Sequence, residues 1–327
     1  MSGMPDLTGT VFAAAQTALQ HLPGYRSFSA GTGARGDYLG LVQSQADALM
    51  AAGVPRGDLP FIKRFPRHAR DCAEIILADL HKRGLVHTTT YDKGLLGQTE
   101  ENMTGFDHGA FKTYIYPEEG LLLAMIAGVT TPRDAIFLGS YYGYWAHWAI
   151  PTIVARGGRV TLVDPNPKCC AVALSNLVYN GHGAAVRVIE SRGEDFLRTT
   201  SDLFDLCVLD AENPRDHPDP EQRGKRVYHS LMKDCLPRLR QNALLVCHNI
   251  LFSDKTGDPA FTDIIARNRD ELGRFCRLVS DHFDPFVEYR TTEGVGIARF
   301  SRKRREIAWP VAADIDLDLK HHESGTA

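Results

Sequence analysis

Between residues 116 and 250 the chain repeats one pattern, in which a short apolar run is followed by a longer amphipathic segment. Apolar runs of four or five residues are typical of strands buried on both faces, and the segments between them are typical of covering helices. The alternation therefore predicts an α/β fold with a doubly wound, mostly parallel sheet. The predicted strands are 135–138, 160–163, 186–189, 206–209 and 243–247, and the predicted helices are 118–127, 167–179, 227–239 and one that begins near 143.

The segments on either side of this region differ from it. After a predicted helix over 261–282, the strands 285–289 and 295–300 flank the turn Thr-Thr-Glu-Gly, which predicts a C-terminal antiparallel hairpin and seven strands in all. Upstream, the sequence predicts helices over 7–21, 38–52 and 60–83 and a loop over 85–111. We therefore predict a helical N-terminal region (1–115) that forms a lid or a homodimer interface, a ligand-binding domain (116–301) and a C-terminal tail (302–327).

Composition excludes several classes of protein. The formal net charge is −3, which gives no overall field to attract nucleic acid or an anionic membrane. No apolar run reaches the roughly 18 residues that span a bilayer, and the N-terminus lacks the pattern of a signal peptide. The seven cysteines show neither metal-type pairing nor a disulfide framework. We expect a cytoplasmic protein whose partner is a small molecule.

Polar residues at the ends of the predicted strands indicate a ligand site, because open α/β sheets bind ligands outside the carboxyl ends of their strands. Gly139 and Gly143 follow the first strand and let the backbone approach a ligand closely. Asp164 ends the second strand, 25 positions after Gly139. A carboxylate there accepts the hydrogen bonds of a ribose, although a helix N-cap is the alternative role. Position 141 lacks the glycine that a pyrophosphate favours, which points to S-adenosylmethionine rather than a nicotinamide cofactor.

These motifs resemble the class I S-adenosylmethionine-dependent methyltransferases, and within them the catechol and caffeoyl-CoA O-methyltransferase group, over about residues 116–301. The segment 138–146, Leu-Gly-Ser-Tyr-Tyr-Gly-Tyr-Trp-Ala, is similar to the group's Leu-Gly-Ala-Tyr-Cys-Gly-Tyr-Ser-Ala. The resemblance implies a Rossmann-like fold and methyl transfer to a small molecule, at oxygen. The cofactor-binding residues that it implies are Gly139, Ser140, Tyr141, Gly143, Asp164, Gly193, Glu194 and Asp210.

The resemblance also implies which residues face the acceptor. Asp210 matches the family's first metal ligand, Asn249 its last, and Glu288 the glutamate that contacts the acceptor hydroxyl. His248 replaces the second carboxylate ligand, and Asn213 replaces the family's lysine. The implied metal ligands are Asp210, His248 and Asn249, which favour a softer ion than Mg²⁺ or no ion at all. The implied catalytic residues are Asp210, His248 and Glu288, with His248 as general base, metal ligand or structural histidine.

Two other functions stay open on the sequence alone. An altered metal pattern fits an enzyme that uses the aminobutyrate arm of S-adenosylmethionine or cyclises it, releasing methylthioadenosine. A protein that binds the cofactor or a partner without catalysis is the other. Tyr142, Tyr144 and Trp145 would line the site of the sulfonium, contact the substrate or pack in the core.

Overall fold

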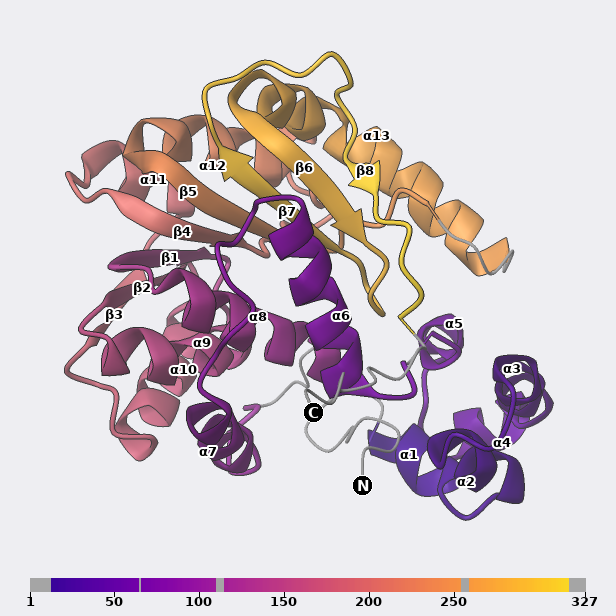
Figure 1. The fold of residues 1–327 in the computed structure, drawn as a ribbon. Helices are drawn as coiled ribbons and strands as arrows, with labels where there is room; N and C mark the ends of the chain where they lie inside the picture. The colour runs from indigo at the N-terminus through magenta and orange to yellow at the C-terminus, as the bar shows by residue number, and fades with distance from the viewer. Residues whose placement is uncertain (1–12, 65, 110–114, 254–258, 318–327) are drawn as a thin grey trace.

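The computed structural model describes residues 13–64, 66–109, 115–253 and 259–317 (Figure 1). Its centre is a mixed sheet with the strand order β3-β2-β1-β4-β5-β7-β6-β8. The first five strands in this order are parallel, and β7 pairs antiparallel with both β5 and β6. The strand order therefore reverses between β1 and β4, where such sheets bind ligands. The bounds are β1 Asp134–Leu138, β2 Arg159–Asp164, β3 Val186–Glu190, β4 Phe204–Leu209, β5 Leu239–His248, β6 Phe283–Tyr289, β7 Val295–Phe300 and β8 Val311–Ala312.

Helices cover both faces of the sheet, as the apolar strands require. Successive residues of β1 alternate between the two faces: Ala135 and Phe137 belong to one hydrophobic cluster, Ile136 and Leu138 to the other. The first cluster is covered by α6 (Ala69–Lys82), α8 (Pro117–Thr130), α9 (Tyr144–Ala155) and α10 (Pro167–Tyr179). The second is covered by α11 (Gly193–Thr199), α12 (Val227–Cys235) and α13 (Pro259–His282).

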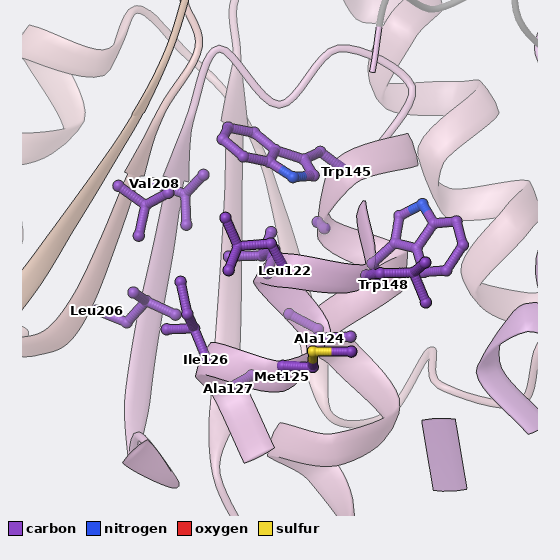
Figure 2. Packing of buried hydrophobic residues seen from close by; sticks show 14 of the residues in the cluster. Leu122, Ala124, Met125, Ile126, Ala127, Trp145, Trp148, Leu206 and Val208 are labelled. Atoms are coloured by element: carbon purple, nitrogen blue, oxygen red, sulfur yellow. The ribbon is translucent and has the colours of Figure 1, made fainter. Parts of the chain in front are cut away.

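The helix α8 packs across the sheet beneath α9 and is apolar on nearly every side (Figure 2). Its Leu122 and Ile126 lie in the same cluster as Leu206 and Val208 of β4. A Cβ atom added at Gly120 would lie 2.4 Å from the indole of Trp148, so only glycine allows this close approach of α8 and α9. The packing fixes the N-terminus of α8, which carries two buried glutamates, against the end of the sheet.

The N-terminal helices form a small core of their own. Their bounds are α1 Ala13–Leu19, α2 Pro23–Ser29, α3 Arg35–Ser44, α4 Ala46–Ala51 and α5 Leu59–Ile62. The predicted helix 38–52 is therefore two helices, and the predicted helix 60–83 is divided between α5 and α6, because Pro66 interrupts it. Residues 7–12 of the first predicted helix lie outside the described residues. Short 3₁₀ helices occupy Arg56–Asp58, Pro220–Gln222 and Leu236–Arg238.

Two sequence predictions were wrong. The predicted loop 85–111 contains the helix α7 (Lys93–Met103), whose N-terminus is capped by the Asp92 carboxylate accepting from the backbone N–H of Leu95 at 2.9 Å. The sheet has eight strands rather than seven, since β8 pairs parallel with β6. That strand lies within the predicted tail, of which residues 318–327 are outside the described part, as are 110–111 of the predicted loop. In the described part of the chain, every helix is too short or too polar to span a membrane.

Candidate active site

A cavity of about 880 Å³ opens at the carboxyl ends of the parallel strands, on both sides of the point where strand order reverses. Segments that follow β1, β2, β4 and β5 line it, together with residues of α13 and of the turn between β6 and β7. Its size suits a ligand of drug-like dimensions. The predicted site residues that line it are Gly139, Ser140, Tyr141, Asp164, Gly193, Glu194, Asp210, His248 and Asn249.

The loop after β1 has a conformation that its glycines make accessible. Gly139 has φ +76°, and a Cβ atom there would lie 2.5 Å from the carbonyl oxygen of Asp210. Gly143, at φ +79°, forms the N-cap of α9. Tyr141 has φ +50° despite its side chain, a strained conformation of the kind that collects at functional sites. Gly139 therefore brings the backbone of the loop close to the end of β4 at the wall of the cavity.

The buried Asp164 carboxylate holds this loop in place. Its Oδ2 accepts from the backbone N–H of Tyr141 at 2.9 Å, and its Oδ1 accepts from that of Asn166 at the same distance. Burial raises the pKa of Asp164, and these two hydrogen bonds oppose the rise. Each carboxylate oxygen keeps one further acceptor site. Asp164 can therefore accept hydroxyl groups of a ligand while it orders the glycine loop.

Other polar groups along the same wall are placed for ligand binding. Glu194 is buried at the start of α11 and accepts from the hydroxyl of Ser230 at 2.7 Å. A Cβ atom at Gly193 would lie 2.4 Å from the side chain of Leu231, so the backbone there is tightly enclosed. The hydroxyl of Ser140 is buried without a hydrogen-bond partner among the described residues. A buried hydroxyl in this state is satisfied when a ligand supplies the partner.

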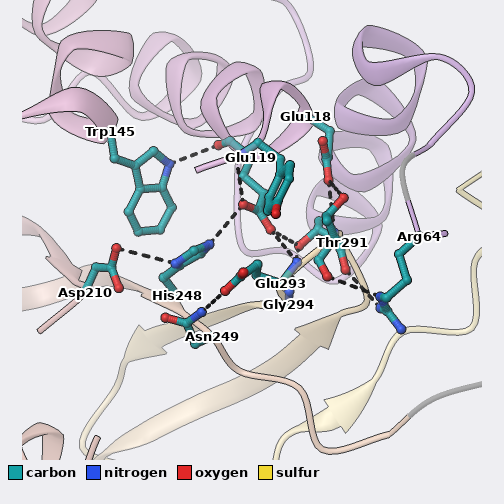
Figure 3. A network of polar contacts seen from close by, with 12 residues as sticks. Arg64, Glu118, Glu119, Trp145, Asp210, His248, Asn249, Thr291, Glu293 and Gly294 are labelled. Atoms are coloured by element: carbon teal, nitrogen blue, oxygen red, sulfur yellow. Dashed lines mark hydrogen bonds and ion pairs between the residues drawn. The ribbon is translucent and has the colours of Figure 1, made fainter. Parts of the chain in front are cut away.

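A chain of buried charges begins at the end of β5 (Figure 3). His248 lies between two carboxylates, with Nε2 2.9 Å from Glu119 Oε2 and Nδ1 3.4 Å from Asp210 Oδ2. Burial disfavours a charged imidazole, but the two carboxylates outweigh it and raise the pKa of His248 well above its usual value. The two carboxylates therefore favour the protonated ring, and both ring nitrogens face a carboxylate.

The row of buried charges continues through Asp210 to a lysine at the end of the loop that follows β4. Lys225 Nζ donates to Asp210 Oδ1 at 3.0 Å and lies 3.9 Å from Glu212 Oε2. Although burial opposes ionisation, Lys225 and His248 hold the pKa of Asp210 well below its usual range. The loop reaches the site through a bridge between Asn213 and Gly224, whose backbone groups exchange two hydrogen bonds of 3.2 Å.

The turn between β6 and β7 contributes a further carboxylate, Glu293, which lines the cavity. The side-chain amide of Asn249 donates to Glu293 Oε2, and Asn249 itself has φ +54°. Burial raises the pKa of Glu293 to about 8. His248 and Lys225 oppose this rise, whereas the other carboxylates of the network add to it. Glu293 is therefore a carboxyl group that exchanges a proton near neutral pH.

The turn is held from two directions (Figure 3). From α8, Glu119 Oε1 accepts from the hydroxyl of Thr291 at 2.7 Å and from the backbone N–H of Glu293 at 3.0 Å. From the N-terminal region, the guanidinium of Arg64 donates to the carbonyl oxygens of Arg290, Thr291 and Thr292 at 2.9–3.3 Å. The position of Glu293 thus depends on segments far apart in the sequence.

The structure brings most, but not all, of the predicted residues together. Glu288 does not line the cavity: its buried Oε1 accepts from the backbone N–H groups of Phe252 and Ser253 at 2.8 and 3.0 Å. Gly143 lies behind the loop as a helix cap. Trp145 lines the cavity and donates through Nε1 to the carbonyl oxygen of Glu119 at 3.1 Å, and Tyr144 also lines it, whereas Tyr142 is packed in the core.

Three residues of the site were absent from the sequence-based set. They are Glu119, Lys225 and Glu293. A signal existed for Glu119, since a glutamate at the start of an apolar helix must bury its charge and needs a partner. Glu293 was placed in a turn and assigned no chemical role. Lys225 carries no local signal.

The predicted metal ligands do not fit a divalent cation. Each oxygen of Asp210 contacts a cationic side chain, and both nitrogens of His248 contact carboxylates. The described residues contain no group of three or more histidine, cysteine, aspartate or glutamate side chains arranged to hold a metal. A hard cation needs several free oxygen ligands, which this arrangement does not offer.

A mixed sheet with this order and a site at its carboxyl ends defines a Rossmann-like α/β fold. Residues 136–250 match the family described as "Methyltransferase domain", which confirms over these residues the resemblance seen in the sequence. Among curated proteins, a "Putative O-methyltransferase" of Mycobacterium ulcerans is 28% identical over 151 residues, 46% of this chain and 62% of that protein. The "Catechol O-methyltransferase" of Niastella koreensis is 23% identical over 153 residues, 46% of this chain and 63% of that protein.

The chain thus spans about three fifths of the length of the curated relatives it matches. Among solved structures, the Podospora anserina methyltransferase PaMTH1, determined with bound SAH, is 19% identical. Its alignment covers 68% of this chain and 95% of that chain, with a TM-score of 0.48.

Proposed function

We propose that the protein is an S-adenosylmethionine-dependent methyltransferase that acts on an oxygen atom of a small molecule. The observation that carries the proposal is the pairing of Asp164 with the glycine loop at the point where strand order reverses. The buried Ser140 hydroxyl and the enclosed backbone at Gly193 support the same ligand. The methyltransferase family match covers this segment, and the similar proteins carry O-methyltransferase names.

The division of labour follows from the geometry. Asp164, Glu194 and the loop 139–143 would hold the adenosine and amino-acid parts of the cofactor, whose sulfonium supplies the methyl group. Glu293 would take the proton of the acceptor hydroxyl. Bound in this way, the cofactor would supply the methyl group to the acceptor oxygen, and the electron pair of the carbon–sulfur bond would stay on sulfur. The cavity would have to exclude water and hold the acceptor in line with this bond.

Replacing Asp164 with alanine should weaken binding of adenosylhomocysteine by roughly 10- to 100-fold, because hydrogen bonds to a charged group are worth about 1.5–3 kcal/mol. The measurement is calorimetric titration of the purified protein. Asp195→Ala is the matched control. Asp195 follows Glu194 in the sequence but is exposed, so this variant should bind the ligand like the parent.

Unchanged affinity in Asp164→Ala would contradict the assigned site. Product analysis separates the alternative chemistry: release of methylthioadenosine instead of adenosylhomocysteine would exclude methyl transfer as the reaction.

Turnover should rise with pH through about 8, because Glu293 acts as a base only when it is ionised. The groups that set this value are His248, Lys225, Glu119 and Asp210. Replacing Glu293 with glutamine should lower kcat at least about 100-fold and remove the rise with pH. The pH profile is measured as adenosylhomocysteine release with an acceptor found by screening phenolic compounds. A profile that keeps the same rise in the glutamine variant would assign the base to another group.

We further propose that the N-terminal region (1–115) serves as the acceptor-side lid of the domain 116–301. Phe61 and Ile115 line the cavity, and Arg64 contacts the turn that carries Glu293. The tail, predicted as 302–327, contributes β8 to the edge of the sheet. A homodimer formed through the N-terminal helices stays a prediction, which analytical ultracentrifugation tests.

A further inference from the structure

Asp210, which the resemblance matches to a metal ligand, contacts a cation that belongs to the chain. The Lys225 ammonium is buried, lines the cavity and contacts Asp210, the residue that matches the family's first metal ligand. Its side chain is only 8% exposed, whereas that of Asp210 is 28% exposed. The ion pair therefore lies at the edge of the cavity, where an acceptor oxygen would meet it.

Several contacts fix Lys225 in this place. Its backbone N–H donates to Glu271 Oε2 of α13 at 2.8 Å, and Nζ lies 5.2 Å from the ring centre of Tyr228. Gly224, at φ +57°, turns the chain just before it, and a Cβ atom there would lie 2.5 Å from Glu271. A lysine side chain is flexible in solvent, but these contacts hold the ammonium of Lys225 in one place.

The bridge between Asn213 and Gly224 relates this lysine to the departures in the sequence. Asn213 stands where the resembling family has a lysine, and the residue after its bridge partner is Lys225. Lys225, next to one partner of the bridge, therefore supplies the positive charge that Asn213, the other partner, lacks. The histidine at 248, which replaces a carboxylate, adds a second cationic group against Asp210.

We propose that Lys225 takes the place of a divalent cation in this pocket, so that the charge facing the acceptor oxygen is an ammonium of the chain itself and metal is excluded. The proposal rests on the proposed methyl transfer for its acceptor. A divalent ion brought to Asp210 would lie close to the ammonium, and the two like charges would repel each other strongly at such a short distance. Removing the ammonium should therefore open the site to metal.

The experiment is Mn²⁺ binding, followed by electron paramagnetic resonance on EDTA-treated protein with adenosylhomocysteine present. The parent protein should bind no stoichiometric Mn²⁺ at about 1 mM, the weak end of biological divalent-cation sites. Lys225→Ala should bind Mn²⁺ at least about tenfold more tightly, because the ammonium beside Asp210 and Glu212 is removed while His248 stays in place. Lys225→Arg keeps the charge and should behave like the parent.

Lys233→Ala is the matched control, since Lys233 is exposed on α12 and should change nothing. Stoichiometric Mn²⁺ binding by the parent protein would overturn the proposal, and this titration needs no variant. Failure of Lys225→Ala, with its melting temperature intact, to bind Mn²⁺ more tightly would also overturn it. Binding of adenosylhomocysteine in the same samples tests the cofactor site separately. The Mn²⁺ titration can therefore contradict the role of Lys225 while the cofactor site stands, and the reverse is also possible.

Discussion

Replacing His248 with leucine is expected to destabilise the folded protein by about 3–5 kcal/mol, the usual cost of removing one partner from a buried ion pair. His248 is 1% exposed and lies between Glu119 and Asp210. Without the imidazole, the buried Glu119 side chain loses the only ion pair that it makes among the described residues. Urea unfolding followed by circular dichroism measures the loss.

The matched control is His147→Leu. His147 is also buried, but burial lowers its pKa to about 4, so its ring is neutral at pH 7 and needs no counter-charge. We expect this variant to lose only about 1 kcal/mol, the value of an ordinary hydrogen bond. Equal losses in the two variants would contradict the ion-pair explanation for His248.

The pH dependence of the His248 contribution has a defined sign. Its folded pKa is raised, so its contribution to stability is complete below the ordinary value of 6.5 and is lost as pH rises toward the folded pKa. The stability difference between the parent and His248→Leu should therefore shrink from pH 6.5 upward. A difference that grows over this range would mean that the ring is neutral in the folded protein.

Replacing Gly139 with alanine is expected to cost roughly 3 kcal/mol or more and to abolish binding of adenosylhomocysteine. Two effects add: strain at φ +76° costs about 1–3 kcal/mol, and the new Cβ atom would lie 2.5 Å from backbone atoms of Asp210 and Ala211. Gly139 follows β1, and Asp210 and Ala211 follow β4, so neither backbone segment can move without displacing a strand of the sheet. The loop that carries Ser140 and Tyr141 would therefore shift away from Asp164.

Gly157 provides a control that separates the two effects. It has the same φ of +76°, but an added Cβ atom meets nothing within 4 Å. Gly157→Ala should therefore show the strain alone, about 1 kcal/mol, and bind the ligand normally. Thermal unfolding and calorimetric titration of both variants give the comparison. If Gly157→Ala is as damaging as Gly139→Ala, the close packing around Gly139 is not the cause.

The site residues at the ends of the strands could be predicted from the sequence, because ligands of such sheets bind at the carboxyl ends of the parallel strands. Parallel strands share an edge, so Gly139, Asp164, Asp210 and His248 had to meet once their strands were recognised. The helix α7 was missed because glycine and threonine around it suggested a loop, although Asp92 was an available N-cap. The strand β8 has two residues and therefore no periodic pattern to recognise.

The chemistry around Asp210 could not be predicted in the same way. Lys225 reaches it through the Asn213–Gly224 bridge, and Glu293 reaches the cavity because α8 holds the turn before β7. The first placement depends on how the loop between β4 and α12 folds, and the second on contacts between segments far apart in the sequence. Neither has a local sequence pattern. Glu288 shows the converse: a strand matched by resemblance carried a glutamate that binds backbone N–H groups rather than facing the cavity.

The guanidinium of Arg64 has a consequence for any attempt to shorten or transplant this protein. It supplies the donors for three consecutive carbonyl groups, those of residues 290–292, and thereby stiffens the turn that ends in Glu293. A chain that began at residue 116 would retain every strand but leave those carbonyl groups without their donor. The segment from 116 onward therefore depends on the N-terminal region for the conformation of this turn. Any exchange of the N-terminal region would have to preserve Arg64 to keep Glu293 in place.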